Sequence, residues 1–238
     1  LACQLLLLPA ACFALVVLFR LPPILAVGMM LLAASPGGTT ANLYSHLFRG
    51  DVALNISLTA INSVIAVVTL PIIANLAIAW FQPGDLSLGM QFGKTVEVFL
   101  IVLVPVAVGM VVRALSPRFA TAMDRPVRIA SIAILVLVIA GAAVANRDIL
   151  VAQFLILGGV TTAFCVVSLT VGYIVPRLAK IEKPQAVASA FEVGIHNATL
   201  AIVVAQSVLG RPDMALPAAV YGVLMFPLAA GFAFWVTE

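Results

Sequence analysis

Charged residues are scarce in this chain: Asp, Glu, Lys and Arg together make up 9% of its 238 residues. Hydrophobic residues make up 64%, and the mean hydropathy is +1.23. A soluble domain needs a more polar surface, so the composition indicates an all-α polytopic membrane protein. The net charge of +3 is small and lies in the loops, which favours a role in membrane topology and not in binding nucleic acid.

Residues that carry chemistry are also few. The chain has two histidines and three cysteines, and Cys3, Cys12 and Cys165 lie in apolar segments without the spacing of metal ligands. The sequence has no paired carboxylates, no nucleophile with a base, no phosphate-binding loop and no zinc spacing. We therefore expect that the protein is not an enzyme. We interpret the cysteines as small packing residues.

Apolar stretches separated by short turns rich in proline, glycine or charge predict eight membrane crossings. They cover about residues 1–19, 24–48, 52–81, 95–115, 127–146, 149–175, 184–209 and 214–237. Of the Lys and Arg residues in the alternating loops, eight fall on one side and four on the other. The positive-inside rule then places the C-terminus in the cytoplasm.

A helix-breaking cluster interrupts the second predicted crossing at residues 35–42, Ser-Pro-Gly-Gly-Thr-Thr-Ala-Asn. Pro36 removes a backbone donor, and Gly37 and Gly38 permit non-helical dihedral angles. Such a break is tolerated at membrane depth where it is buried in protein or lines a watery cavity, and the freed helix ends then become ion or anion sites. We predict a broken helix that forms half of a substrate site; the alternative is an ordinary loop near the surface.

A second candidate break covers residues 191–199, Phe-Glu-Val-Gly-Ile-His-Asn-Ala-Thr. Glu192 is the one carboxylate that we expect near mid-membrane, where an ionised group has to pair, coordinate a cation or hold a proton. A structural glutamate that hydrogen-bonds between helices is the alternative. For His196 three roles stay open: a proton-coupling group, a polar ligand or a helix-packing histidine.

Polar oxygens are available near both breaks. Asn55, Thr59 and Asn62 recur at i, i+4 and i+7, which places them on one helix face. Asn42 follows the first break, and Gln4 lies in the otherwise apolar first helix. Amide, hydroxyl and carboxylate oxygens are hard ligands that suit sodium, although each residue alone could simply hydrogen-bond between helices.

An internal repeat follows the two breaks. Residues 49–54 read Arg-Gly-Asp-Val-Ala-Leu and residues 211–216 read Arg-Pro-Asp-Met-Ala-Leu, each opening the next helix. The copies are expected on opposite sides of the membrane, five helices apart, which predicts an inverted repeat. Asp is favoured at a helix start as a cap in any case, so a match this short can also arise by chance.

Three motifs together resemble the bile acid:sodium symporter family: Pro-Gly-Gly-Thr-Thr-Ala-Asn at 36–42, the pattern at 49–54, and Phe-Glu-Val-Gly-Ile-His-Asn at 191–197. The resemblance implies an inverted-repeat transporter of ten helices, of which the fourth and ninth are broken and cross. This chain would be an N-terminally truncated, bacterial-type member that begins at the family's third helix, so eight transmembrane helices are visible. Residues 1–94 and 149–238 would form the core domain, and 95–148 the remaining part of the panel domain.

The resemblance also implies ligands. One sodium site would use Asn42, Asn55, Thr59 and Glu192, with Ala41 where the family often has a serine. A second would use Gln4, Glu192, Val193, Ile195 and His196, with the histidine where the family often has glutamine. Substrate contacts would be Thr39, Thr40 and Asn197, close to helix N-termini that favour an anionic group.

The expected function is sodium-coupled symport of an organic anion, a monocarboxylate or a bile-acid-like compound, by alternating access. The expected setting is the bacterial inner (plasma) membrane, with sodium as the bound ion and with the oligomeric state open. One alternative is a proton-coupled transporter or cation/proton antiporter that uses Glu192 and His196. The other is a non-transporting membrane sensor or assembly subunit.

Overall fold

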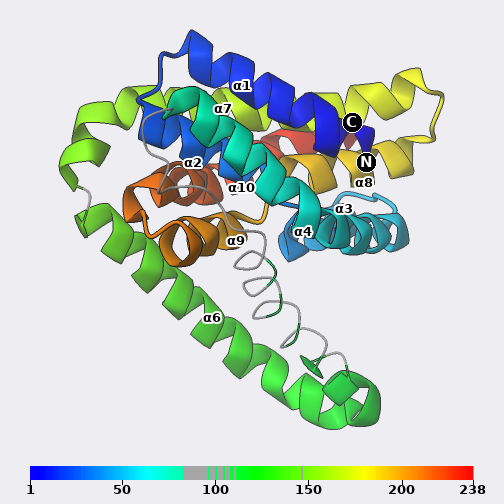
Figure 1. Ribbon diagram of the computed structural model, residues 1–238. Helices are drawn as coiled ribbons and strands as arrows, with labels where there is room; N and C mark the ends of the chain where they lie inside the picture. The colour runs from blue at the N-terminus through cyan, green and yellow to red at the C-terminus, as the bar shows by residue number, and fades with distance from the viewer. Residues whose placement is uncertain are drawn as a thin grey trace.

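A computed structural model describes residues 1–82, 96, 100, 104, 108–109, 111–145 and 147–237. Within these residues the chain is helical and contains no strand, and Figure 1 shows the course of the helices. The elements are η1 (Cys3–Leu7), α1 (Leu8–Leu18), α2 (Pro23–Ala34), α3 (Thr39–Leu47), α4 (Val52–Phe81), α6 (Pro117–Ala145), α7 (Arg147–Leu178), α8 (Lys183–Gly194), α9 (Ala198–Val203), η3 (Val204–Val208), η4 (Pro212–Ala215) and α10 (Leu216–Thr237).

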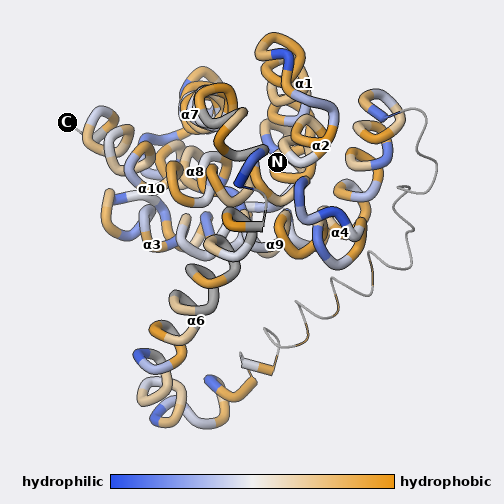
Figure 2. The backbone as a smooth tube through the Cα atoms, turned by 90° about the vertical axis from the view of Figure 1, so that its left-hand side faces the viewer, coloured by the Kyte–Doolittle hydropathy of each residue, from blue (hydrophilic) through white to orange (hydrophobic). Residues whose placement is uncertain are grey.

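Helix α2 lies at the centre of the packed helices, in contact with α1, α4, α10 and η4. Ten of its twelve residues are buried. This fits its sequence, since a helix that is apolar on all sides is stable where other helices surround it. Helix α6 extends away from this body (Figure 1). Apolar residues predominate along the helices, while polar residues gather mainly at their ends and turns (Figure 2).

Three helical stretches of the described chain are long and apolar enough to cross a membrane: Val52–Phe81, Leu155–Leu178 and Pro212–Val236. Shorter apolar helices cover Cys3–Leu18, Pro23–Ala34 and Ala198–Val208. The protein is thus a helical, polytopic membrane protein. The number of eight crossings stays a prediction, since most of the expected crossing at 95–115 lies outside the described residues.

Both predicted breaks are present. Helix α2 ends at Ala34 and α3 begins at Thr39, while α8 ends at Gly194 and α9 begins at Ala198. The two breaks also contact each other: the Gly38 amide donates to the Ile195 carbonyl at 2.7 Å, and the Asn197 amide donates to the Pro36 carbonyl at 2.9 Å. Each break therefore satisfies a backbone group that the other has freed.

One helix start differs from the prediction. The helix that contains the crossing expected at 127–146 begins ten residues before that range, since α6 starts at Pro117 directly after the non-helical Ser116. Proline is favoured in the first turn of a helix, and arginines such as Arg118 and Arg125 are good helix formers, so the charged stretch continues the helix instead of forming a loop. Helix α4 covers the whole of the crossing expected at 52–81, with Pro71 inside it.

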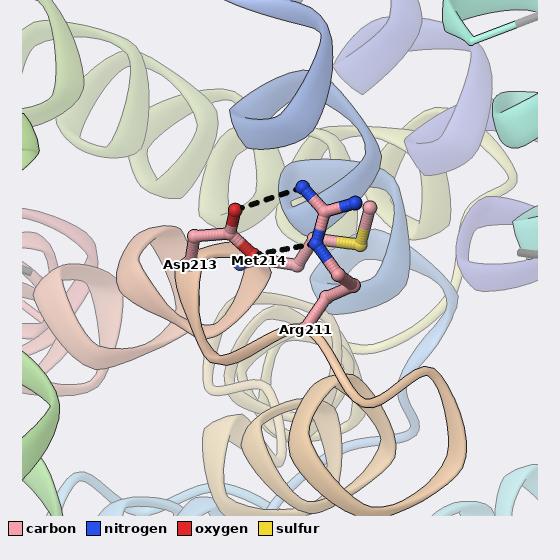
Figure 3. Close-up of polar contacts among 3 residues, drawn as sticks. All are labelled: Arg211, Asp213 and Met214. Atoms are coloured by element: carbon pink, nitrogen blue, oxygen red, sulfur yellow. Dashed lines mark hydrogen bonds and ion pairs between the residues drawn. The ribbon is translucent and has the colours of Figure 1, made fainter. Parts of the chain in front are cut away.

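The two repeated segments start their helices with the same aspartate in different ways. Asp51 caps α4, since its Oδ1 accepts from the Leu54 amide at 2.9 Å. Asp213 accepts from the Met214 amide at 3.1 Å and pairs through both oxygens with Arg211, at 3.3 and 3.0 Å (Figure 3). Asp51 is therefore a helix cap, whereas Asp213 lies in the first turn of η4, and the inverted repeat stays a prediction.

Candidate functional site

The Glu192 carboxylate is the centre of a buried polar cluster. Helix α8 carries it to the crossing of the two breaks, where its side chain is 1% exposed. Its Oε2 accepts from the Thr59 hydroxyl at 2.5 Å, and its Oε1 accepts from the Asn62 amide nitrogen at 2.9 Å. Both donors come from α4, so this carboxylate ties the second broken helix to α4.

Gly37 makes room for this carboxylate. A methyl group on Gly37 would overlap the carboxyl carbon and both oxygens of Glu192. Any larger residue would therefore displace the carboxylate from Thr59 and Asn62. Glu192, which lies just before the second break, therefore requires a glycine at position 37 in the first break.

Asn55 joins three helices beneath the carboxylate. Its side-chain nitrogen donates to the Ser45 hydroxyl at 2.5 Å, to the Ala188 carbonyl at 3.0 Å and to the Ala41 carbonyl at 3.4 Å. Its Oδ1 lies 3.5 Å from the Thr59 hydroxyl. The amide nitrogen thus fastens α3 and α8 to α4, while the amide oxygen lies on the side of Thr59 and remains available to a cation.

Two further amide oxygens near the breaks are buried without a hydrogen-bond partner. They are Asn62 Oδ1 and Asn42 Oδ1. Leaving a buried acceptor unsatisfied costs about 1–3 kcal/mol, so these two oxygens are candidate ligands for a cation or acceptors for a proton donor. We call Glu192, Thr59, Asn62, Asn55 and Asn42 the carboxylate group.

A second set of polar side chains meets at the carbonyl of Ser35. The Gln4 amide nitrogen donates to this carbonyl at 2.8 Å, and His196 Nδ1 lies 3.3 Å from the same oxygen. The Gln4 nitrogen and His196 Nδ1 are 3.5 Å apart. Gln4 reaches this point from the π-helical turn η1, a helix irregularity that is frequent at functional sites. We call Gln4, Ser35 and His196 the carbonyl group.

The ligands expected at a second sodium site are therefore divided. Glu192 contacts α4, whereas Gln4 and His196 contact Ser35. The Ile195 carbonyl accepts from Gly38, and Val193 is a buried residue within α8. The backbone of Gly37, which lies against the Glu192 carboxylate, pairs with that of His196, so both groups lie at the crossing of the breaks.

The expected substrate contacts lie at the start of the helices that leave the breaks. Thr39, the first residue of α3, is exposed, and Thr40 and Asn197 are half-buried. Asn197 caps α9 because its Oδ1 accepts from the Leu200 amide at 3.0 Å. The cap uses the amide oxygen of Asn197 and leaves its side-chain nitrogen as a donor.

Asn62 is the residue that the expected ligand sets omit. Its spacing from Asn55 already placed it on the polar face of α4, and the structure shows its direct contact with Glu192. Ser35 is also absent from those sets. Its contribution is a backbone carbonyl, for which the side-chain pattern gives no signal.

Comparison with known proteins adds independent information. The family model described as "Sodium Bile acid symporter family" matches residues 1–153. A probable chloroplast sodium/metabolite cotransporter of Arabidopsis thaliana is 30% identical over 225 residues, which cover 91% of this chain and 53% of that protein. An uncharacterized sodium-dependent transporter of Bacillus subtilis (strain 168) is 26% identical, with 91% of this chain and 65% of that protein covered.

The human ileal sodium/bile acid cotransporter is 28% identical over 210 residues, with 86% of this chain and 58% of that protein covered. The chain thus spans less than two thirds of the length of each of these relatives.

Proposed function

Because the chain belongs to the sodium/bile acid symporter family, we propose that it is a sodium-coupled secondary transporter of an organic anion. Members of this family are transporters and not enzymes, and the chain is an integral membrane protein. The proposed substrate class is a monocarboxylate or a bile-acid-like compound, moved together with sodium by alternating access.

The carboxylate group is the observation that carries this proposal. Glu192 is buried at the crossing of two broken helices, and amide oxygens of Asn62 and Asn42 lie buried without a partner. Sodium, as the coupling ion and cargo, would take ligands from Glu192, Thr59, Asn55, Asn42 and, in addition, Asn62. The ion would compensate the charge of Glu192, which an apolar surrounding otherwise penalises strongly.

Sodium at this place would also favour one state of the protein. Its ligands come from α3, α4 and α8, so a bound ion stabilises the arrangement in which the two breaks face each other. The anion would then bind beside the crossing, at Thr39, Thr40 and the side-chain nitrogen of Asn197. Transport of sodium and of the anion is coupled because sodium binds this state more tightly than the other states of the transporter.

Alternating access requires two bodies that move against each other. We propose the inverted-repeat core, residues 1–94 and 149–238, as one body and the panel, residues 95–148, as the other. The proposed setting is the bacterial inner membrane with the C-terminus in the cytoplasm, supported by the larger number of Lys and Arg residues on that side.

The test is uptake of labelled cholate and labelled pyruvate into proteoliposomes under an imposed sodium or pH gradient. The proposal predicts that one of these anions accumulates under a sodium gradient and that Glu192→Gln abolishes the sodium dependence. Uptake that follows the pH gradient and ignores sodium would replace the proposal with proton coupling through Glu192 and His196. Transport of neither anion, together with stability that is independent of sodium, would indicate a non-transporting membrane protein.

A further inference from the structure

The carboxylate group and the carbonyl group differ in what they offer to a cation. In the carboxylate group the unpartnered atoms are the oxygens Asn62 Oδ1 and Asn42 Oδ1. In the carbonyl group they are one oxygen, Gln4 Oε1, and one nitrogen, His196 Nε2. Sodium is a hard cation that prefers oxygen, so the two groups are unequal as sites.

Protein donors already occupy the Ser35 carbonyl. A carbonyl oxygen can only accept, so the His196 Nδ1 that lies 3.3 Å away donates its hydrogen there, and Gln4 donates at 2.8 Å. Two donors fill both lone pairs of this oxygen. The nitrogen of His196 that faces Gln4 is therefore a donor and not a ligand.

The neighbouring break carbonyls are similarly engaged. The Ile195 carbonyl accepts from the Gly38 amide at 2.7 Å, and the Gly194 carbonyl accepts from the Tyr221 hydroxyl at 2.8 Å. These bonds fasten the second break to the first break on one side and to α10 on the other.

Aromatic neighbours hold the imidazole in this orientation. The ring of His196 stacks on Phe164 with centroids 5.3 Å apart and planes 19° apart, and it meets Tyr221 edge to face at 5.5 Å. The side chain is 1% exposed. Turning Nε2 toward Gln4 would break the contact of Nδ1 with the Ser35 carbonyl.

From this geometry we infer that the carbonyl group is a hydrogen-bonded cross-link in place of a second cation, so that each chain binds a single sodium ion, at the carboxylate group. His196 is the positioning residue: its Nδ1 joins the second break to the first break at the Ser35 carbonyl, which Gln4 joins to η1. This inference rests on the proposed sodium coupling and adds its stoichiometry.

The inference predicts what a glutamine at position 196 would do. In His196→Gln, an amide nitrogen can still donate to the Ser35 carbonyl, and the new amide oxygen joins Gln4 Oε1. Gln4 and the new glutamine then offer two side-chain oxygens to a cation, in place of the one oxygen and one nitrogen of Gln4 and His196. We expect this variant to bind a second sodium ion, whereas a histidine that merely packed would leave the number of ions unchanged.

The experiment is equilibrium binding of radioactive sodium to the detergent-solubilised chain by scintillation proximity, counted as ions per chain. The expected result is one ion for the unaltered protein and two for His196→Gln, with the Hill coefficient of sodium-driven uptake rising from about 1 toward 2. Two ions in the unaltered protein would overturn the inference and leave the proposed function intact.

No sodium bound by the unaltered protein would overturn the proposed function itself. One ion in both proteins would overturn the role of His196, since another feature would then exclude the second ion. If His196→Gln does not fold, His196→Asn provides the same amide chemistry, and the count in the unaltered protein decides the stoichiometry by itself.

Discussion

Gly37→Ala tests whether the carboxylate position depends on the first break. The methyl group would occupy the place of the Glu192 carboxylate, which would have to leave Thr59 and Asn62. A hydrogen bond to a charged group contributes about 1.5–3 kcal/mol, so loss of both bonds lowers the free energy of unfolding by about 3–6 kcal/mol. For a chain of this length, about 1 kcal/mol corresponds to about 2–4 °C in Tm, so we expect a fall of about 10 °C.

The neighbouring glycine provides a matched control. In Gly38→Ala the methyl group would lie 3.3 Å from the backbone carbonyl oxygen of His196, which would have to give way by a few tenths of an ångström. The φ of Gly38 is −85°, which alanine adopts without strain, so we expect a smaller loss of stability than in Gly37→Ala. The assay is thermal unfolding in detergent in sodium and in potassium. Equal Tm values and equal sodium responses for the two variants would refute the reasoning.

Two other substitutions separate sodium binding from packing. Thr59→Val keeps the shape but removes the hydroxyl that donates to the buried carboxylate, and should weaken sodium binding about 10-fold in a sodium titration of Tm. Thr69→Val, whose hydroxyl bonds within its own helix, should leave sodium affinity unchanged. Gly28→Ala places a methyl group against the backbone carbonyl of Met214 and should lower stability by about 1–3 kcal/mol, equally in sodium and potassium. A loss confined to sodium would contradict that explanation.

The breaks could be predicted from sequence because their cause is local. Pro36 and the two glycines after it cannot continue a helix, and α2 ends just before them at Ala34. The need of Glu192 for a polar partner was also accessible, since a carboxylate in an apolar segment has to find one, and Thr59 and Asn62 provide it. Helix α4 follows the apolar stretch at 52–81 that the sequence delimits with charged and turn residues.

Which polar side chains contact each other depends on tertiary packing, which the sequence pattern does not give. The spacing placed Asn55, Thr59 and Asn62 on one face, but which of them reach Glu192 depends on how α4 is rotated against α8. The convergence of Gln4 and His196 on the Ser35 carbonyl depends on a backbone oxygen, and a backbone oxygen has no signature in the sequence.

The most direct test of sodium coupling is the Tm of the purified chain in sodium and in potassium or choline at equal ionic strength, for the unaltered protein and for Glu192→Gln. A ligand that binds only the folded state at 100 times its Kd adds about 2.7 kcal/mol of stability, or about 5–10 °C for a chain of this length. The account predicts a sodium-specific rise of this size in the unaltered protein and none in Glu192→Gln. A Tm that does not respond to sodium, or a rise that persists in Glu192→Gln, would contradict it.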